Sequence, residues 1–237
     1  MSEALAEPSR SDVSTIYKYE TADKTFDLIQ NFKGQGEAVF TQPFGPVKCA
    51  GGKFFSSHNP VARSLAAPQK MAYMAHSYWQ STGNKYSSSF ITGMPTMFAQ
   101  PHYSKALEAI RESKDISGTF NTNLVEVRPD TKTAIFEVLA GENKGKKIEK
   151  EFGLLHVVPP MGPLDFIKSS PLADGAGWVD VDAGTLQHKK YENVFSLGDA
   201  SSLPTSKVSV PDRNDRGVAD NRPPPLSPLR PLSSHTT

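Results

Sequence analysis

The chain has 237 residues, of which 37% are hydrophobic and 22% are charged, and its formal net charge is +1 at pH 7. This composition is ordinary for a globular protein of one large or two small domains, and the balanced charge gives no general attraction to nucleic acid or anionic membranes. The single cysteine excludes an internal disulfide and favours a reducing compartment. The acid-containing first twenty residues predict no signal peptide, and no apolar run is long enough to span a membrane.

The first predicted strand leads directly to the cysteine. Residues 1–15 are polar and are predicted to be disordered, whereas Glu37–Gln42 (EAVFTQ) is apolar and rich in β-formers. The prolines and glycines of the following PFGPVKCAG build a turn, so Cys49 is expected just past the end of that strand. A helix of about four turns then follows, with Pro68 near its start and Gly83 near its end.

A second strand and a second helix repeat this order. The segment YSSSFITGMPTMF predicts a strand followed by a turn at residues 93–95. The segment HYSKALEAIRES predicts an amphipathic helix with Tyr103, Leu107 and Ile110 on one face. Strands that alternate with helices predict an α/β fold with a parallel sheet.

The remaining segments predict shorter β elements and a tail. Leu124–Val127 and Thr133–Leu139 flank a turn at Pro129 and predict a β-hairpin. EFGLLHVVPP adds a strand, and GWVDVD and NVFSLGDA both look strand-like. Residues 208–237 are rich in Pro, Arg and Ser and are predicted to form a disordered tail.

Two candidate site residues follow predicted strands. Ligands of open parallel sheets bind at the carboxyl ends of the strands, where Cys49 and Asp199 both fall. Cys49 is either a buried inert thiol or a nucleophile, and Asp199 either belongs to a simple turn or accepts hydrogen bonds from sugar-type hydroxyls. The Gly-x-Gly pairs that begin at Gly34 and Gly175 lack the third glycine of a dinucleotide-binding fingerprint.

Other conspicuous side chains are assigned structural roles. His156 lies in an apolar strand and is predicted to be a hydrogen-bonded core histidine, whereas His188 is predicted to lie in a solvated turn. Trp79 and Trp178 are expected to anchor the packing. No His, Cys or carboxylate residues show metal-ligand spacing, so no bound metal is expected.

Between Lys18 and Lys207 the sequence contains PVKCAG with APQK, then LLHVVPPMGP, then GWVDVDAGTLQHKKYENVFSLGDASSLPTSK. Together these motifs resemble the mitochondrial-type sulfide:quinone oxidoreductases, which are flavoproteins with two dinucleotide-type folds. The resemblance implies an FAD/NAD(P)-binding, Rossmann-like domain and FAD as the cofactor. By position it implies that Cys49 is a redox cysteine, that Asp199 binds the ribityl chain of the flavin, and that Lys207 contacts the cofactor.

The resemblance also implies an activity and a location. In this family hydrogen sulfide is oxidised, its sulfur passes to a small acceptor, and two electrons pass through FAD to quinone. The full-length enzymes associate with the mitochondrial inner membrane and have no nucleic-acid partner. The implied organisation is a second dinucleotide-type domain at residues 16–160, which contains an insertion at residues 52–66. A return segment of the FAD domain follows at residues 161–207.

Departures from the family pattern leave alternatives open. The G-x-G-x-x-G half of the flavin domain is not found ahead of Lys18, and the second redox cysteine is not found after PTSK, so this truncated chain is expected to be inactive. A relative of the NADH:quinone dehydrogenases is one alternative, although hydride transfer needs no thiol. A non-catalytic binding fragment that pairs through an uncovered sheet edge is another.

Two segments interrupt the family motifs and generate a testable hypothesis. We hypothesise that residues 52–66 and 208–237 are translated introns, because Gly52-Lys53 and Val208-Ser209 match a splice-donor sequence translated in two frames. Sequencing of the mature transcript is expected to show abundant message that lacks both segments. Abundant message that retains both would contradict the hypothesis and make them genuine protein segments.

Overall fold

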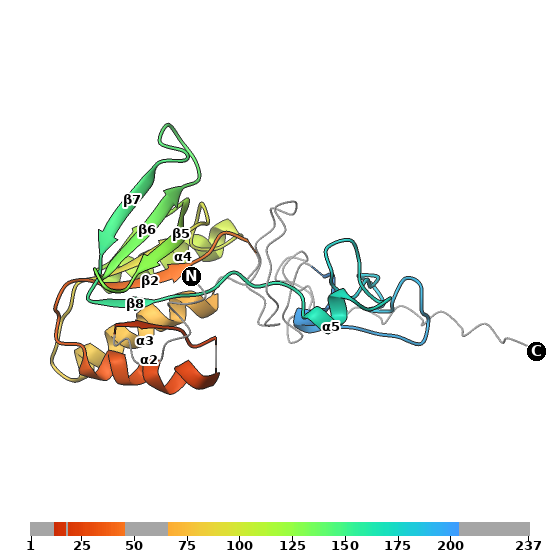
Figure 1. Ribbon diagram of the computed structural model, residues 1–237, viewed down its shortest axis with the longest axis horizontal. Coiled ribbons are helices and arrows are strands. Elements are labelled where there is room, and N and C mark those ends of the chain that lie inside the picture. The colour runs from red at the N-terminus through yellow and green to blue at the C-terminus, as the bar shows by residue number, and fades with distance from the viewer. Residues whose placement is uncertain (1–11, 18, 46–65, 204–237) are drawn as a thin grey trace, which may run out of the picture. The chain divides into compact units, whose positions relative to one another are not determined.

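The structure, a computed structural model, describes residues 12–17, 19–45 and 66–203 (Figure 1). The chain divides into two compact units, and along the described residues the division falls between Pro160 and Met161. The first unit holds all the strands of the two sheets, and the second is built mainly from turns and isolated bridges.

A five-stranded parallel sheet forms the centre of the first unit. Its strand order is β1-β8-β2-β3-β4, and every neighbouring pair is parallel. The strands are β1 (Val13–Ser14), β8 (Leu154–His156), β2 (Ala38–Gln42), β3 (Ser88–Thr92) and β4 (Ile116–Thr119). All five residues of the middle strand β2 are buried, as expected for a parallel strand that is covered on both faces.

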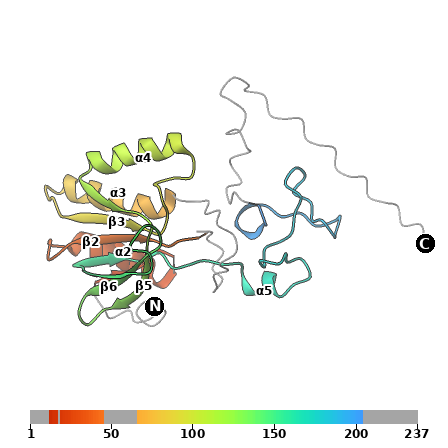
Figure 2. The same ribbon diagram turned by 90° about the horizontal axis from the view of Figure 1, so that it is seen from above.

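Three helices connect these strands. They are α2 (Tyr19–Asn31), α3 (Ala66–Ser81) and α4 (Pro101–Ser113). Helices α2 and α3 lie on one face of the sheet, and α4 contacts β4, which is an edge strand of the sheet (Figures 1 and 2). The predicted α/β fold with a parallel, Rossmann-like sheet is confirmed, and so are the helices that were expected after β2 and β3.

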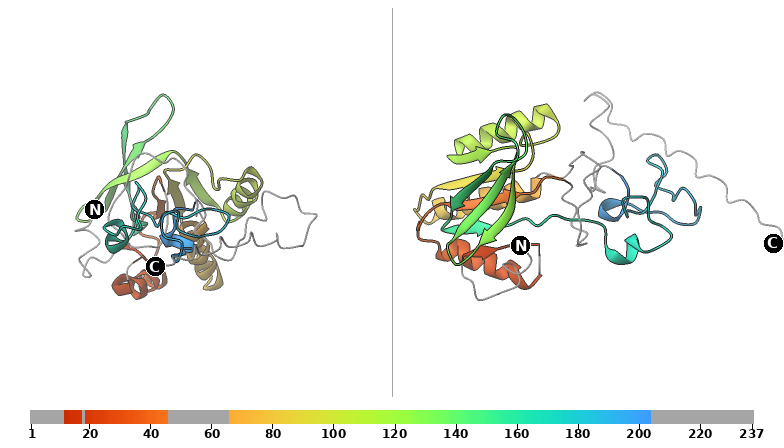
Figure 3. Two further views of the ribbon diagram at one scale, coloured as in Figure 1. Left: turned by 90° about the vertical axis from the view of Figure 1, so that its right-hand side faces the viewer. Right: turned by 45° about the horizontal axis from the view of Figure 1, so that its top comes forward.

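A three-stranded antiparallel sheet covers the opposite face. It consists of β5 (Thr122–Arg128), β6 (Thr133–Val138) and β7 (Lys147–Glu151), and Figure 3 shows it on the side away from α2 and α3. The predicted hairpin is confirmed as β5 and β6. The third strand was missed because its sequence, KIEKE, is mostly charged and exposed and carries little apolar signal.

The alternation of side chains along β2 separates two cores. Phe40 belongs to the core beneath α2 and α3, whereas Val39 belongs to the core beneath the antiparallel sheet. The same alternation holds for Leu154 and Leu155 in β8. This period-two pattern fixes the register, because a shift by one residue would exchange the two cores.

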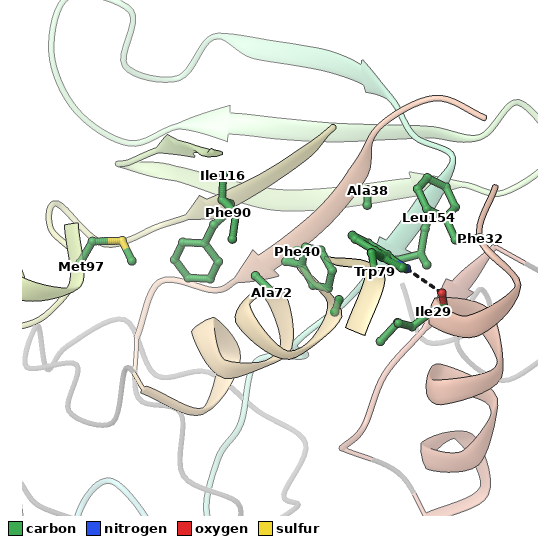
Figure 4. Packing of buried hydrophobic residues seen from close by; sticks show 11 residues of the cluster. Ile29, Phe32, Ala38, Phe40, Ala72, Trp79, Phe90, Met97, Ile116 and Leu154 are labelled. Atoms are coloured by element: carbon green, nitrogen blue, oxygen red, sulfur yellow. Dashed lines mark hydrogen bonds between the residues drawn. The ribbon is translucent and has the colours of Figure 1, made fainter. Parts of the chain in front are cut away.

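Trp79 anchors the core on the helix side (Figure 4). Its indole Nε1–H donates to the Ile29 carbonyl at 2.7 Å and so joins α3 to α2. Its ring lies 5.4 Å from that of Phe32 and 5.3 Å from that of Tyr86. The predicted role of Trp79 as a packing anchor is confirmed.

The second unit contains little regular structure. Among its described residues, 161–203, it has the short helix α5 (Asp165–Lys168) and the 3-10 turn η1 (Gly198–Ala200). Its core consists of Ile167, Val179 and Val181 with partly buried neighbours.

The strands predicted in GWVDVD and NVFSLGDA are wrong, because these segments make single bridges instead of ladders. Asp182, the last residue of GWVDVD, accepts hydrogen bonds from the amides of Gly184 and Thr185, and these bonds turn the chain at the end of that segment.

The N-terminal boundary also differs from the prediction. Residues 1–15 were expected to be disordered, yet Val13 and Ser14 form β1 beside β8, and Thr15 is fully buried. A two-residue strand is too short to show a periodic pattern. Helix α2 was missed as well, because its inward positions include the hydroxyl residues Thr21 and Thr25 instead of apolar side chains.

The predicted apolar face of α4 is only partly correct. Leu107 packs against the helix-side core, but Tyr103 and Ile110 are 44% and 42% exposed. Arg111 is the buried residue of this helix, and its guanidinium donates to the Ile116 carbonyl of β4. Gly118 leaves room for this contact, because a Cβ there would lie 2.8 Å from the Arg111 Nε.

The bond between Trp79 and Ile29 gives a stability prediction. Trp79→Phe is expected to lower the free energy of unfolding by about 1–3 kcal/mol, because it removes the buried indole N–H and with it the hydrogen bond that the Ile29 carbonyl accepts. Met74→Ala, at a residue of α3 that is 64% exposed, is the control and is expected to change it by less than about 0.5 kcal/mol. Urea denaturation followed by far-ultraviolet circular dichroism measures both, and equal effects would contradict this role.

Candidate functional site

The carboxyl edge of the parallel sheet is the expected place for a ligand. At this edge the Gly93 amide donates to the Gln42 carbonyl at 3.0 Å, which joins the end of β2 to the residue that follows β3. The Phe44 amide donates to Asn123 Oδ1 at 3.0 Å. A Cβ on Gly93 would lie only 2.5 Å from the Phe44 nitrogen, so only glycine permits this approach. The chain that leaves β2 is therefore held on two sides.

Thr41 joins β2 to β8 at the same edge. Its hydroxyl donates to the His156 carbonyl at 3.1 Å and accepts the Val158 amide at 3.2 Å. Strand β8 ends at His156, so this side chain continues the connection where the backbone ladder stops. Residues as far as Val158 thereby stay beside β2.

The APQK motif positions the start of α3. Gln69 is 1% exposed, and its Nε2 donates to the Met97 carbonyl in the segment after β3. The Tyr73 hydroxyl donates to Gln69 Oε1 at 3.4 Å. Burial raises the pKa of Tyr73 to about 12, so it remains a donor at neutral pH. Gln69 thus fixes the helix that follows the cysteine motif in sequence.

The Gly198-Asp199 motif forms the turn η1 in the second unit. Gly198 is buried and has φ 70, in the left-handed region that favours glycine. The Ser201 hydroxyl donates to the Gly198 carbonyl at 2.9 Å, and the Val179 amide donates to the Ala200 carbonyl at 2.9 Å. This turn holds Asp199, which is half-buried, in a defined position.

The prediction that His188 lies in a solvated turn is wrong. His188 is 5% exposed, and its Nδ1 accepts the amides of Lys190 and Tyr191 at 2.9 and 3.1 Å. Its other nitrogen, Nε2, lies 3.0 Å from the Leu172 carbonyl. Because Nδ1 accepts, the tautomer that satisfies every partner carries the proton on Nε2 and donates it to Leu172. His188 therefore organises the interior of the second unit.

His156 is a core histidine, as predicted, but not a hydrogen-bonded one within the described residues. Its side chain is 0% exposed, and neither ring nitrogen has a partner there. Burial lowers its pKa from 6.5 to about 4, so the imidazole is neutral at physiological pH. The Phe40 ring lies 6.1 Å away between centroids.

Among the three predicted site residues, the structure locates Asp199, whereas Cys49 and Lys207 lie outside the described residues. Thr41 and Gln69 were not singled out from the sequence. Gln69 lies within APQK, so the motif carried a signal, but Thr41 is one residue of an ordinary strand. Over the described ranges, no group of three or more His, Cys, Asp or Glu residues could hold a metal, and no helix is long and apolar enough to cross a membrane.

Comparison with known proteins identifies relatives. No protein-family model matches the chain. The chain is 41% identical over 210 residues to the mitochondrial sulfide:quinone oxidoreductase of Mus musculus, and 40% identical over 212 residues to that of Schizosaccharomyces pombe. These alignments take in 88% of this chain but only 43% and 42% of the relatives, so the chain spans less than half of their length.

A solved structure supports the fold. The sulfide:quinone oxidoreductase from the hyperthermophilic bacterium Aquifex aeolicus aligns with a TM-score of 0.61 and 18% identity, over 84% of this chain and 43% of that chain. At this identity the similarity shows the fold alone. The predicted resemblance to sulfide:quinone oxidoreductases is confirmed by the two sequence relatives, and the Rossmann-like fold by the solved structure.

The hydrogen bonds of His188 give a prediction for the second unit. His188→Ala is expected to speed amide hydrogen exchange at Lys190 and Tyr191 by at least tenfold, because both amides lose their acceptor. His188→Asn, whose amide oxygen can replace Nδ1, is expected to restore part of the protection. Lys189→Ala, which removes only the exposed ion pair with Asp180, is the control and is expected to leave both rates nearly unchanged.

His156 gives a prediction for pH. Below pH 6.5 the unfolded chain binds a proton at this imidazole, whereas the folded chain does so only near pH 4. The free energy of unfolding is therefore expected to fall by up to about 3 kcal/mol as the pH drops through this window. Urea midpoints at pH 7, 6, 5 and 4 should fall more steeply for the unmodified chain than for His156→Leu. Parallel curves would show that His156 does not titrate in this way.

Proposed function

We propose that this chain is part of a sulfide:quinone oxidoreductase and forms its second dinucleotide-type domain together with the return segment of its FAD domain. The identity of 41% over 210 residues carries the proposal. The described residues agree with it, because β2 of the Rossmann-like sheet precedes the cysteine motif in sequence and APQK lies in the first turn of α3. The whole enzyme would oxidise hydrogen sulfide, transfer sulfur to a small acceptor and reduce quinone at the mitochondrial inner membrane.

The cofactor assigned to this enzyme is FAD, which supplies a two-electron acceptor when it is bound. The turn η1 fits a role in holding it. A carboxylate accepts hydrogen bonds from hydroxyl groups, and Asp199 is presented by a turn whose glycine carries no side chain to block close approach. We assign Asp199 to the ribityl hydroxyls and Lys207 to a further cofactor contact.

The thiol of Cys49 is assigned to sulfide chemistry. Thiolates are the reactive form of cysteine, and a neighbouring positive charge such as that of Lys48 favours them. In the described structure, Gln69 fixes the start of α3, which follows this motif in sequence, and the Gly93 amide binds the end of β2, which precedes it.

The alternatives have less support. The sequence relatives are sulfide:quinone oxidoreductases, and a relative of the NADH:quinone dehydrogenases would not need the cysteine motif. A non-catalytic binding fragment is the second candidate, because the five-stranded sheet has the edge strands β1 and β4, at which another chain can pair. Purified chain tests this directly: a colourless protein that takes up no added FAD would favour the fragment.

A chimera tests the enzymatic proposal. The segment of the mouse relative that aligns with this chain is replaced by residues 18–207 without 52–66, and sulfide-dependent reduction of a soluble quinone is measured. The chimera is expected to reduce quinone, and Cys49→Ser in the same chimera is expected to lower the rate by at least a hundredfold while FAD remains bound. A chimera that binds FAD equally well but shows the same rate with and without Cys49 would refute the role of the thiol.

A further inference from the structure

The space between α2 and the parallel sheet changes from apolar to polar along the strands. The inward positions of α2 are Thr21 and Thr25 in its N-terminal half and Ile29 in its C-terminal half. A helix that connects parallel strands runs antiparallel to them, so its N-terminal half covers their carboxyl ends. The hydrogen bond from the Thr21 hydroxyl to the Thr15 carbonyl, just after β1, confirms this direction.

The sheet shows the same change beneath the helix. Ser14 pairs with His156, and Phe40 also pairs with His156, so these three side chains share one face. Phe40 belongs to the helix-side core, which identifies the face as the one beneath α2 and α3. Gln42 lies two residues beyond Phe40 and is therefore on the same face, diagonal to His156. At the amino end the corresponding residues of β8 and β2 are Leu154 and Ala38.

The three polar side chains are buried without hydrogen-bond partners among the described residues. Ser14, Gln42 and His156 are 2%, 2% and 0% exposed. The orphaned atoms are the Ser14 hydroxyl, both polar atoms of the Gln42 amide and both ring nitrogens of His156. Buried polar groups in folded proteins almost always have a partner, so a cluster of this kind points to a bound molecule.

The chemistry of the cluster limits what that molecule can be. Its groups are a hydroxyl, an amide and an imidazole that burial keeps neutral, so neither a phosphate nor a metal cation would find a counter-charge. The buried charged residue among the described ones is Arg111, and its guanidinium binds the Ile116 carbonyl of β4. Strand β3 lies between β4 and β2, so this charge does not belong to the cluster. The side chains are closed off from solvent, so the molecule must be small.

We propose that Ser14, Gln42 and His156 form an internal site for a water-sized, uncharged hydrogen-bonding molecule, either H₂O or H₂S. Such a molecule both donates and accepts, as the orphaned donors and acceptors of the three side chains require. The choice of H₂S rests on the proposed function, whereas the choice of H₂O does not. In either case the site lies at the carboxyl end of the sheet, beside the strand that leads to the cysteine motif.

Nuclear magnetic resonance of the full chain, labelled with ¹⁵N-histidine, tests the site. Bound H₂O is expected to give cross-relaxation between the His156 ring protons and a long-lived water signal. Bound H₂S is expected to shift the His156 ring nitrogens saturably when sulfide is added at pH 6, where neutral H₂S dominates, and much less at pH 8.5, where the anion dominates. A water signal without a sulfide response assigns H₂O and leaves the proposed function untouched. The absence of both responses would overturn the site.

Variants provide an independent readout. With a bound molecule, Gln42→Leu and Ser14→Ala remove hydrogen bonds to it and are each expected to lower the melting temperature by about 2–4 °C. With an empty site, these replacements remove unsatisfied polar atoms and would raise the melting temperature or leave it unchanged, which would overturn the proposal. Ser88→Ala is the matched control, because Ser88 is also buried and orphaned on the helix-covered face but lies at the amino end of the sheet, in line with Ala38. If Gln42→Leu fails to fold, the measurements on the unmodified chain decide alone.

Discussion

The hydroxyl of Thr41 is the contact on which the carboxyl edge of the sheet depends. Strand β8 ends at His156, two residues short of the level that β2 reaches. Beyond that point the two described strands share no ladder bond. The Thr41 hydroxyl replaces it, because it donates to the His156 carbonyl and accepts a hydrogen bond from the Val158 amide. It holds the chain as far as Val158 beside the central strand.

Strand β2 connects the two hydrophobic cores of the first unit. Its side chains alternate between the helix-side core and the core under the antiparallel sheet, so both layers are registered against the same five residues. Trp79 then ties α3 to α2 from outside the sheet. The result is a Rossmann-like frame that carries a cysteine motif, and not a glycine fingerprint, after its central strand.

The functional conclusions rest on different parts of the chain. Similarity to sulfide:quinone oxidoreductases covers most of the sequence, and the turn that presents Asp199 belongs to the second unit. The neutral cluster of Ser14, Gln42 and His156 belongs to the first unit and would exist whether or not the chain is catalytic. The enzymatic proposal and the internal site therefore succeed or fail separately.

Elements with strong local signals were predictable from the sequence. The strand at Ala38–Gln42, the helix at Ala66–Ser81 and the hairpin of β5 and β6 each show apolar patterning bounded by Pro, Gly or Asp, and the structure confirms them. Gly83 marks the end of its helix through a left-handed φ of 75. The cysteine motif likewise pointed to the family, because its residue order is specific.

Tertiary structure alone decided the features whose partners are distant in sequence. β1 exists because β8, about 140 residues later by the paired positions Val13 and Leu155, offers it a ladder. His188 is buried because the Leu172 carbonyl and two neighbouring amides converge on its ring. The cluster around His156 forms because three strands bring polar side chains to one face. Local sequence encodes periodicity and turns, but burial of a polar residue depends on which distant groups fold against it.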